Sequence, residues 1–330
     1  MDGWRGVKDM PDGAALRAPV WDELGSIARV LAADDLDDAG EVVLDEGFLR
    51  SGWERPAFDP ASDAWLAVDG AGTVVGYAQV AGEEPDVVES WGVVHPGHRG
   101  RGLGTALLDR IEERAGRLLP DLPAVRFRHA INAGDRAAAA MLEARGLRFV
   151  RHFWHMQAEL AGPLEPGPPP AGIAIAGIRS PGDLPDVHRV LEAAFADHWG
   201  HEARTYARWV GEEASGPGYD PGLWLVARRD GSVVGALTAL TMGSRGWVGF
   251  LGVAAPERGR GVATALLRHS FALFAARGFG RVILAVDADN ETAAALYERA
   301  GMRVVKRWDL WERTCDRGGD AADAPPSSPV

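Results

Sequence analysis

The sequence predicts two related α+β domains joined by a short linker. Its 330 residues suffice for two domains at roughly 150 residues each. The segment 93–108 returns as 253–267, and the arginines Arg99 and Arg258 within it are 159 residues apart (258 − 99 = 159). Proline and glycine dominate residues 161–172, which therefore cannot form a helix or a central strand. We expect domains at 1–160 and 173–314, a linker at 161–172 and a disordered tail at 315–330.

Composition and charge restrict the class of protein. Hydrophobic residues make up 46% of the chain and charged residues 25%, which is typical of a globular protein and excludes a disordered or collagen-like one. No apolar run approaches the roughly 20 residues of a membrane span, and the first residues do not resemble a signal peptide. Cys315 is the single cysteine, so no intramolecular disulfide can form. The net charge of −12 argues against nucleic acid and favours a cationic small molecule, and we expect a cytoplasmic protein without a membrane partner.

The same order of elements is expected in each half. A first strand leads into an amphipathic helix, at 20–31 and at 183–195. A hairpin follows, with Gly and Asp in its turn, at 65–68 with 74–80 and at 223–227 with 233–240. Residues at helical spacing, all apolar except Ser270, mark a long helix after the repeated motif: Leu103, Leu107, Ile111 and Leu118, and Leu266, Leu267, Ser270, Phe271 and Phe274. The strand before the motif is expected at 87–93 and at 247–253, and the strand after the long helix at 125–129 and at 282–286. A short helix follows at 135–145 and at 290–300, and a last strand follows each short helix.

The repeated motif is a glycine-rich turn between a strand and a helix. Its glycines allow a ligand to approach the backbone, and the amides at the helix start carry partial positive charge. Such a turn suits a phosphate or a diphosphate. It is not a nucleotide P-loop, because no Lys-Ser/Thr pair follows the last glycine. It is not a dinucleotide fingerprint either, because Thr105 stands where the third glycine belongs.

The two turns resemble the acyl-CoA pyrophosphate motif of the GNAT N-acetyltransferase superfamily, Arg/Gln-x-x-Gly-x-Gly/Ala. The motif residues are Arg99, Gly102 and Gly104 in the first half and Arg258, Gly261 and Ala263 in the second. The Val-x-x-Pro lead-in and the Leu-Tyr-Glu-x-x-Gly-Met stretch of the second half also look like that superfamily, and the tandem arrangement is similar to mycothiol synthase. The resemblance implies a mostly antiparallel, twisted sheet in each domain, flanked by helices, whose fourth and fifth strands splay apart.

The resemblance also implies the co-substrate and where it binds. Acetyl-CoA would donate its acetyl group directly to a primary amine, with pantetheine in the gap between the splayed strands. No metal is expected, because no histidine pair has further ligands close by. The residues assigned to acetyl-CoA are Val93, Val94, Arg99, Gly100, Arg101, Gly102, Leu103, Gly104 and Thr105, and Leu251, Gly252, Val253, Arg258, Gly259, Arg260, Gly261, Val262, Ala263, Thr264 and Asn290.

The candidate acid that protonates the departing thiolate is Tyr297, since the superfamily often uses a tyrosine in this helix. Asn290 precedes it by seven residues, about 700° of helix rotation, so both lie on one face. The alternative is a half-buried core tyrosine and an asparagine that only caps the helix. The aligned residues of the first half are Leu142 and Asp135, and leucine has no proton to donate. We therefore expect the second half to catalyse, while the first binds CoA idly, is vestigial or helps to build the acceptor pocket.

The sequence leaves the general base open. Glu89 lies before the motif of the first half, where the family often keeps a carboxylate, and Gly249 aligns with it in the second half. Other candidates are Asp287 and the segment 197–201, and a further possibility is deprotonation through water and backbone carbonyls. The superfamily usually lines its acceptor pocket with the region that holds this segment, so His198, Trp199 and His201 are candidate substrate residues.

The acceptor and the oligomeric state are open as well. We expect a small-molecule amine. The alternatives are an aminosugar-linked cysteine, a protein N-terminus, and a non-catalytic protein that senses acyl-CoA. A duplicated chain can be a monomer that forms its own pseudo-dimer, or it can form a homodimer.

Overall fold

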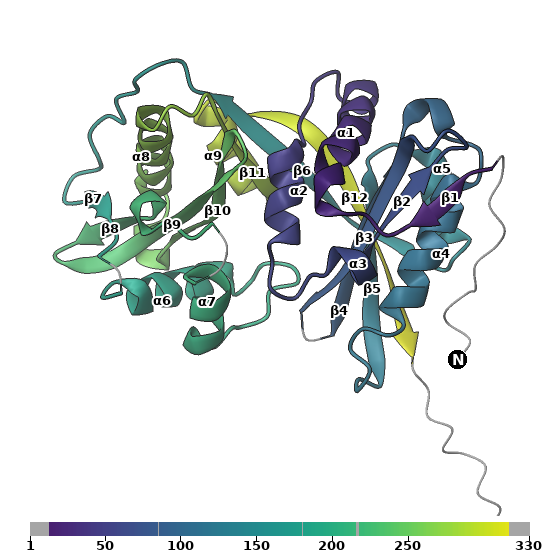
Figure 1. Cartoon of the computed structure of the whole chain (residues 1–330). Coiled ribbons are helices and arrows are strands. Elements are labelled where there is room, and N and C mark those ends of the chain that lie inside the picture. Colours follow the sequence, from purple (N-terminus) through teal and green to yellow (C-terminus); the bar gives the residue numbers. More distant parts are fainter. Residues whose placement is uncertain (1–12, 85, 180, 216–217, 317–330) are drawn as a thin grey trace, which may run out of the picture. The chain divides into compact units, whose positions relative to one another are not determined.

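The computed structural model describes residues 13–84, 86–179, 181–215 and 218–316 (Figure 1). The chain divides into two compact units. Unit 1 comprises residues 1–49, 56–152 and 307–330, and unit 2 comprises residues 50–55 and 153–306. The expected tail lies outside the described residues from 317 onward, but Cys315 and Asp316 belong to the last strand, and Cys315 is buried.

The elements follow the predicted order in both halves. The strands are β1 (Ala15–Arg17), β2 (Ala64–Val68), β3 (Val74–Glu84), β4 (Val87–Val94), β5 (Ala124–Asn132), β6 (Arg148–Glu159), β7 (Ala174–Gly177), β8 (Leu225–Arg229), β9 (Ser232–Met242), β10 (Arg245–Val253), β11 (Arg281–Asp287) and β12 (Arg303–Asp316). The α-helices are α1 (Leu24–Asp38), α2 (Glu46–Trp53), α3 (Pro60–Asp63), α4 (Leu103–Ala115), α5 (Arg136–Glu143), α6 (Leu184–Phe195), α7 (Tyr206–Glu213), α8 (Val262–Ala276) and α9 (Glu291–Arg299). Short 3-10 helices are η1 (Trp21–Glu23), η2 (Pro96–His98), η3 (Pro221–Leu223) and η4 (Ala255–Glu257).

The predicted hairpins β2–β3 and β8–β9 are confirmed as antiparallel pairs. In the first, the carboxylate of Asp69 closes the turn by accepting the amides of Ala71 and Thr73, at 3.0 and 2.9 Å. The expected helix from Leu103 to Leu118 is too long. Helix α4 ends at Ala115, and Leu118 lies in the turn that follows.

The fourth and fifth strands of each repeat splay apart as predicted. Strands β4 and β5 pair in parallel from Val87–Arg126 to Trp91–Ala130. Strands β10 and β11 pair only at Gly246–Val282 and Trp247–Ile283. Beyond these pairs, β4 and β10 continue with no strand on that side in the described part of the chain. Each unit thus has a gap beside the end of the strand that leads into the glycine-rich turn.

The last strands of the two sequence halves are exchanged between the units. Strand β6, from the first half, pairs with β11, from Phe153–Asp287 to Glu159–Arg281. Strand β12, from the second half, pairs with β5 of unit 1. The strand order is β1-β2-β3-β4-β5-β12 in unit 1 and β6-β11-β10-β9-β8-β7 in unit 2. The compact units therefore differ from the sequence repeats by one strand each.

Helices cover both faces of each sheet. In unit 2, a Cβ atom at Gly252 would meet Leu191 and Ala194 of α6, whereas one at the neighbouring position of the adjacent strand, Gly235, would meet Leu266 of α8. The two helices thus lie on opposite faces (Figure 1). Glycine at these positions allows the helices to pack close to the sheet.

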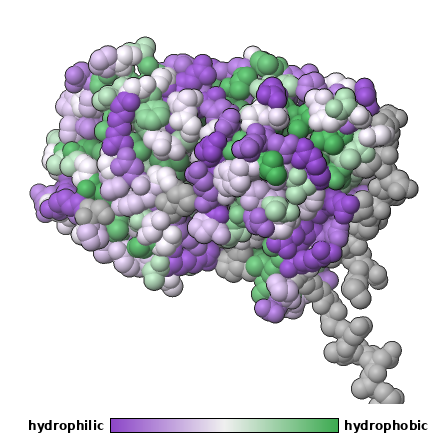
Figure 2. Space-filling view, in the orientation of Figure 1, coloured by the Kyte–Doolittle hydropathy of each residue, from purple (hydrophilic) through white to green (hydrophobic). Residues whose placement is uncertain are grey.

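The visible surface mixes polar and apolar residues (Figure 2). The large hydrophobic side chains that are exposed are scattered along the sequence: Val20, Trp21, Leu36, Phe149, Leu164 and Tyr206. Within the described residues, no helix has the length and apolar character that crossing a membrane requires.

Candidate active site

The turn between β10 and α8 has the backbone geometry of an anion-binding site. Gly259 and Gly261 have φ values of 74° and 81°, a conformation that L-residues with side chains rarely adopt. The first hydrogen bond within α8 runs from the amide of Ala265 to the carbonyl of Gly261, at 3.0 Å. The amides from Gly259 to Thr264 have no acceptor in the described part of the chain. These amides can therefore donate hydrogen bonds together to an anion at the positive end of the helix.

Unit 1 repeats this backbone geometry at the start of α4. Gly100 and Gly102 have φ values of 76° and 83°, and the first helical bond joins the amide of Ala106 to Gly102 at 3.0 Å. The amides from Gly100 to Thr105 likewise have no acceptor among the described residues. The backbone alone does not distinguish the two turns.

The motif arginines do distinguish them. Arg99 donates to Asp37 at 2.6 Å and to Asp34 at 2.7 Å, both on α1. The buried Asp34 also accepts the side-chain amide of Asn132 at 2.9 Å, so it links the turn to the end of β5. Both arginines donate through Nε to the last carbonyl of the preceding strand, Arg99 to Val94 at 3.3 Å and Arg258 to Val253 at 3.0 Å, but Arg258 has no carboxylate partner in the described chain. Two carboxylates thus offset the charge of the motif arginine in unit 1. In unit 2 the carboxylate beside the turn, Glu257, pairs with Arg229 at 2.8 Å and lies 3.7 Å from Arg260, and it leaves Arg258 without a carboxylate.

A β-bulge shapes the edge of the gap in unit 2. The pairing of β10 with β9 shifts between Val248 and Leu251, and the amide of Phe250 leaves the ladder to donate to Thr238 Oγ1 at 2.9 Å. Thr238 is buried, and a Cβ atom at Gly249 would come within 3.1 Å of its hydroxyl. Glycine and threonine together therefore accommodate the extra residue.

The bulge also decides which amides face the gap. The amide of Ala254 donates to Val234 on β9 at 2.9 Å. Because bonding direction alternates along an antiparallel strand, Gly252 also bonds toward β9, whereas Leu251 and Val253 point toward the gap. Of the three predicted residues of this strand, Leu251 and Val253 offer backbone groups on that side.

The register corrects the alignment of Glu89. Glu89 lies opposite Arg128, and the residue opposite the equivalent Ile283 is Trp247. Matching Pro96 with Pro256 leaves the second half one residue short before the arginine and aligns Glu89 with Gly249. The ladders instead match Val94 with Val253, so this loop has the same length in both halves, and the bulge adds one residue to β10. Trp247 therefore occupies the position of Glu89.

Glu89 lies in unit 1, whereas Tyr297 and Asp287 lie in unit 2. Its carboxylate forms an ion pair with Arg128 at 3.3 Å. Arg128 is buried and also donates to Glu312 at 2.8 Å. The structure therefore gives Glu89 a place in a charge network of unit 1.

Tyr297 lies on α9 and packs against the core of unit 2. Burial raises the pKa of its phenol to about 12, so the hydroxyl keeps its proton at neutral pH. That hydroxyl makes no hydrogen bond within the described chain. Asn290 caps α9 by accepting the amide of Ala293 at 3.1 Å, as the alternative interpretation of this residue stated. In unit 1, Leu142 at the position of Tyr297 is fully buried.

The remaining candidates surround the end of β11. Asp287 accepts the amide of Asp289 at 3.0 Å. Burial lowers the pKa of His198, which also senses the charges of Asp287 and Arg258. The charges of the motif arginine and of the strand-end carboxylate thus both act on His198. The ring of Trp199 lies edge-on to Phe153, with centroids 6.3 Å apart. His201 is bound elsewhere, to Glu192 at 3.3 Å.

Sequence reasoning missed three residues of these sites. Asp34 looked like an ordinary residue of an acidic helix, Thr238 like a strand residue, and Phe153 like part of a last strand of the first half. Each acquires its place through a contact distant in sequence. The repeat alignment places its one-residue difference between the proline and the arginine of the turn, so it did not point to the bulge beside Thr238.

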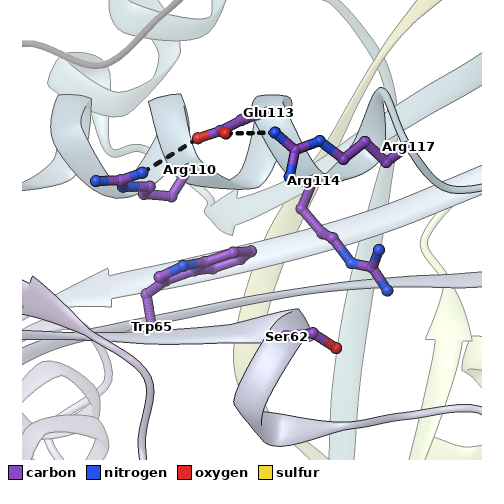
Figure 3. Close-up of a pocket in the computed structure, with 6 residues that line it drawn as sticks. All are labelled: Ser62, Trp65, Arg110, Glu113, Arg114 and Arg117. Carbon is purple, nitrogen blue, oxygen red and sulfur yellow. Dashed lines mark hydrogen bonds and ion pairs between the residues drawn. The ribbon is translucent and has the colours of Figure 1, made fainter.

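A pocket of unit 1 lies apart from the turn (Figure 3). Trp65 and Ser62 lie on one side of it and arginines of α4 on the other. Arg110 and Arg117 both pair with Glu113, at 3.2 and 2.7 Å, and Arg114 pairs with Asp63 at 2.7 Å. Carboxylates thus already occupy these guanidinium groups. Among the described residues, no group of three or more His, Cys, Asp or Glu side chains could hold a metal ion.

The fold and the two turns define an acetyltransferase of the GNAT type, and the chain belongs to the GNAT acetyltransferase family. The family model matches residues 29–147 and 184–302, and each match stops just before an exchanged strand. The protein is thus an acyltransferase with two tandem GNAT domains.

Known relatives share this arrangement. The chain is 30% identical over 299 residues to the mycothiol acetyltransferase of Streptomyces coelicolor, covering 89% of this chain and 92% of the relative. It is 36% identical over 246 residues to that of Clavibacter michiganensis, covering 73% and 77%. A GCN5-related N-acetyltransferase from Sphaerobacter thermophilus superposes with a TM-score of 0.80 at 33% identity, over 94% of this chain and 99% of that one. A tandem GNAT protein of the clavulanic acid pathway shares the fold, with a TM-score of 0.66 at 20% identity, over 93% of this chain and 99% of that one.

Proposed function

We propose that the protein transfers the acetyl group of acetyl-CoA to the primary amine of a small molecule, and that unit 2 carries the reaction. The main support is that an open anion turn and a protonated tyrosine occur in the same unit. In unit 2, Arg258 has no carboxylate partner in the described chain and Tyr297 can donate a proton. In unit 1, Arg99 is bound by two aspartates and Leu142 can donate none. We place the reaction in the cytoplasm.

The residues of unit 2 supply each step of a direct transfer. The amides from Gly259 to Thr264 hold the diphosphate, and the backbone of Leu251 and Val253 borders the pantetheine arm. Asp287 or the neighbouring His198 takes a proton from the ammonium group of the acceptor. The amine nitrogen then bonds to the acetyl carbon as the carbon–sulfur bond breaks. Tyr297 donates its proton to the departing thiolate, and the second proton of the acylated nitrogen passes to the tyrosinate, which leaves a neutral amide, the free thiol of CoA and a restored tyrosine.

We infer that the acceptor is an aminosugar-linked cysteine. The support comes from relatives 30% and 36% identical that are named mycothiol acetyltransferases. The negative net charge of the chain is compatible with an acceptor that approaches as an ammonium ion.

The test is the release of CoA thiol from acetyl-CoA by the full chain with cysteinyl-glucosamine, simple amines and short peptides. Steady release with cysteinyl-glucosamine supports the proposal. Faster release with peptides would support a protein N-terminal acceptor instead. Acetyl-CoA binding without release for any amine would identify a binding protein and contradict the proposed reaction.

A further inference from the structure

The proposed catalytic unit contains a strand from the other half of the sequence. Strand β6 pairs along the whole length of β11, and Phe153 lies directly opposite Asp287. Asp287 is the carboxylate that ends β11, next to the loop that leads to α9. The first half of the chain thus contributes residues at the very end of the strand on which the proposed chemistry depends.

Phe153 meets a second aromatic residue there. Its ring lies edge-on to Trp199, with centroids 6.3 Å apart, and both side chains are half-buried. Trp199 follows His198, which senses the charges of Asp287 and Arg258. Three segments distant in sequence therefore bring two aromatic rings, a carboxylate and a histidine to one place.

At the equivalent strand end of unit 1, the polar side chains bind one another. Trp308 of β12 lies opposite Asn132, which corresponds to Asp287. Asn132 donates to Asp34, and Asp34 also holds Arg99. In unit 1 a buried carboxylate thus links the strand end to the turn, whereas in unit 2 His198 lies near both.

We propose that Phe153 and Trp199 form the aromatic wall of the acceptor pocket in unit 2, so that the first half of the chain helps to select the acceptor. This inference rests on acetyl transfer in unit 2. Aromatic rings pack against the C–H face of a sugar ring, and Asp287 attracts the ammonium group beside it. This chemistry fits an acceptor that carries a pyranose ring next to a primary amine. The first half then has a role in substrate recognition through β6, independent of its own glycine-rich turn.

The test compares Phe153→Ala with Phe149→Ala, a matched change four residues earlier on β6. Phe149 packs against His152 and Trp311 in unit 1. We expect Phe153→Ala to raise the KM for cysteinyl-glucosamine at least tenfold and to leave the KM for acetyl-CoA within twofold, and Phe149→Ala to change neither. Phe153→Leu preserves the buried part of the side chain, and it serves if the alanine variant does not fold. Combined with Trp199→Ala, Phe153→Ala should cost little more than either change alone, because both rings form one wall.

Calorimetry with cysteinyl-glucosamine in the presence of CoA separates the two proposals. If the wild type transfers acetyl groups and Phe153→Ala behaves like it, the aromatic wall is overturned and the function stands. If the wild type releases no CoA but binds the probe, and Phe153→Ala weakens that binding tenfold, the wall stands and the reaction is overturned. If the probe does not bind the wild type, the wall is overturned.

Discussion

Arg313 of β12 lies 3.0 Å from Glu112 of α4, a carboxylate that is completely buried in unit 1. Glu112 also binds Arg145, which in turn binds Asp109, and Arg313 donates to the carbonyl of Arg145 at 2.7 Å. The corresponding residue of β6 is Ala158, which lies opposite Val282 as Arg313 lies opposite Phe127. If the strands were not exchanged, Glu112 would lose a guanidinium partner and Arg313 would lose its carboxylate.

We therefore expect Arg313→Ala to destabilise the protein by about 3–5 kcal/mol, the cost of leaving a buried charge with an incomplete partner set. The matched control is Arg281→Ala, which breaks the exposed pair with Glu159 at the other exchanged strand and should cost less than about 1 kcal/mol. Urea unfolding measures both. Equal losses would show that the buried network does not direct β12 to unit 1.

Tyr297→Phe should lower kcat by about 10²-fold or more, because the thiolate then leaves without a proton from the enzyme. The affinity for acetyl-CoA, measured by calorimetry, should stay within twofold. Because the pKa of Tyr297 is about 12, this residue keeps its proton up to about pH 11. The kcat of the wild type should therefore show no decrease from loss of this proton at any pH below that value. Tyr206→Phe, at an exposed tyrosine of α7, is the control. An unchanged kcat in Tyr297→Phe would remove the residue from the mechanism.

Acetyl-CoA should bind tightly at one site in each chain, in unit 2, because Asp34 and Asp37 already hold Arg99. Calorimetry should give a stoichiometry near one, and Arg258→Ala should weaken this binding. Arg99→Ala should not. Asp34→Asn combined with Asp37→Asn should strengthen binding at unit 1, whereas Asp186→Asn, an exposed change on α6, should have no effect. Two equally tight sites in the wild type would contradict this expectation.

Thr238→Val should lower kcat about tenfold, because the amide of Phe250 loses its acceptor and the bulge is no longer held. The KM for acetyl-CoA should change less, since the turn is intact. Thr238→Ser retains the hydroxyl and should restore kcat. A valine variant with wild-type kcat would show that the bulge does not depend on this hydrogen bond.

The stability of the protein should fall on acidification from pH 6.5 toward pH 4. Burial lowers the pKa values of His129 and His155 to about 4. Between that value and the ordinary 6.5 the unfolded chain binds protons that the folded chain does not, so unfolding is favoured by about 3 kcal/mol for each histidine at the lower end. His129→Gln should reduce this loss in urea titrations at pH 7 and pH 4.5.

Local patterns predicted the elements and the two turns well. The hairpin turn at Asp69 and the glycines before α4 and α8 depend on neighbouring residues, which the sequence displays directly. The bulge was not predicted, because the repeat alignment gave the two strands before the motif equal length and placed its one difference in the loop before the arginine. Only the ladder reveals that Trp247 matches Glu89.

The strand exchange could not be predicted from periodicity. Strands β6 and β12 occupy equivalent registers, so either could pair with either sheet as far as their patterns indicate. The choice depends on contacts distant in sequence, such as Arg313 with Glu112. The pairing of Arg99 in unit 1 likewise depends on Asp34, whose partners follow it by many residues.

The exchange of β6 and β12 sets the order in which the protein can mature on the ribosome. Most of unit 1 is synthesised first, yet its sheet lacks a strand until β12, which follows unit 2 in the chain, has left the exit tunnel. Strand β6, by contrast, is synthesised before the other strands of unit 2, so it is available for pairing when β11 emerges. The later-made unit can therefore reach its native state before the earlier one, and a nascent chain that stalls before β12 emerges would expose the open edge of β5 to aggregation.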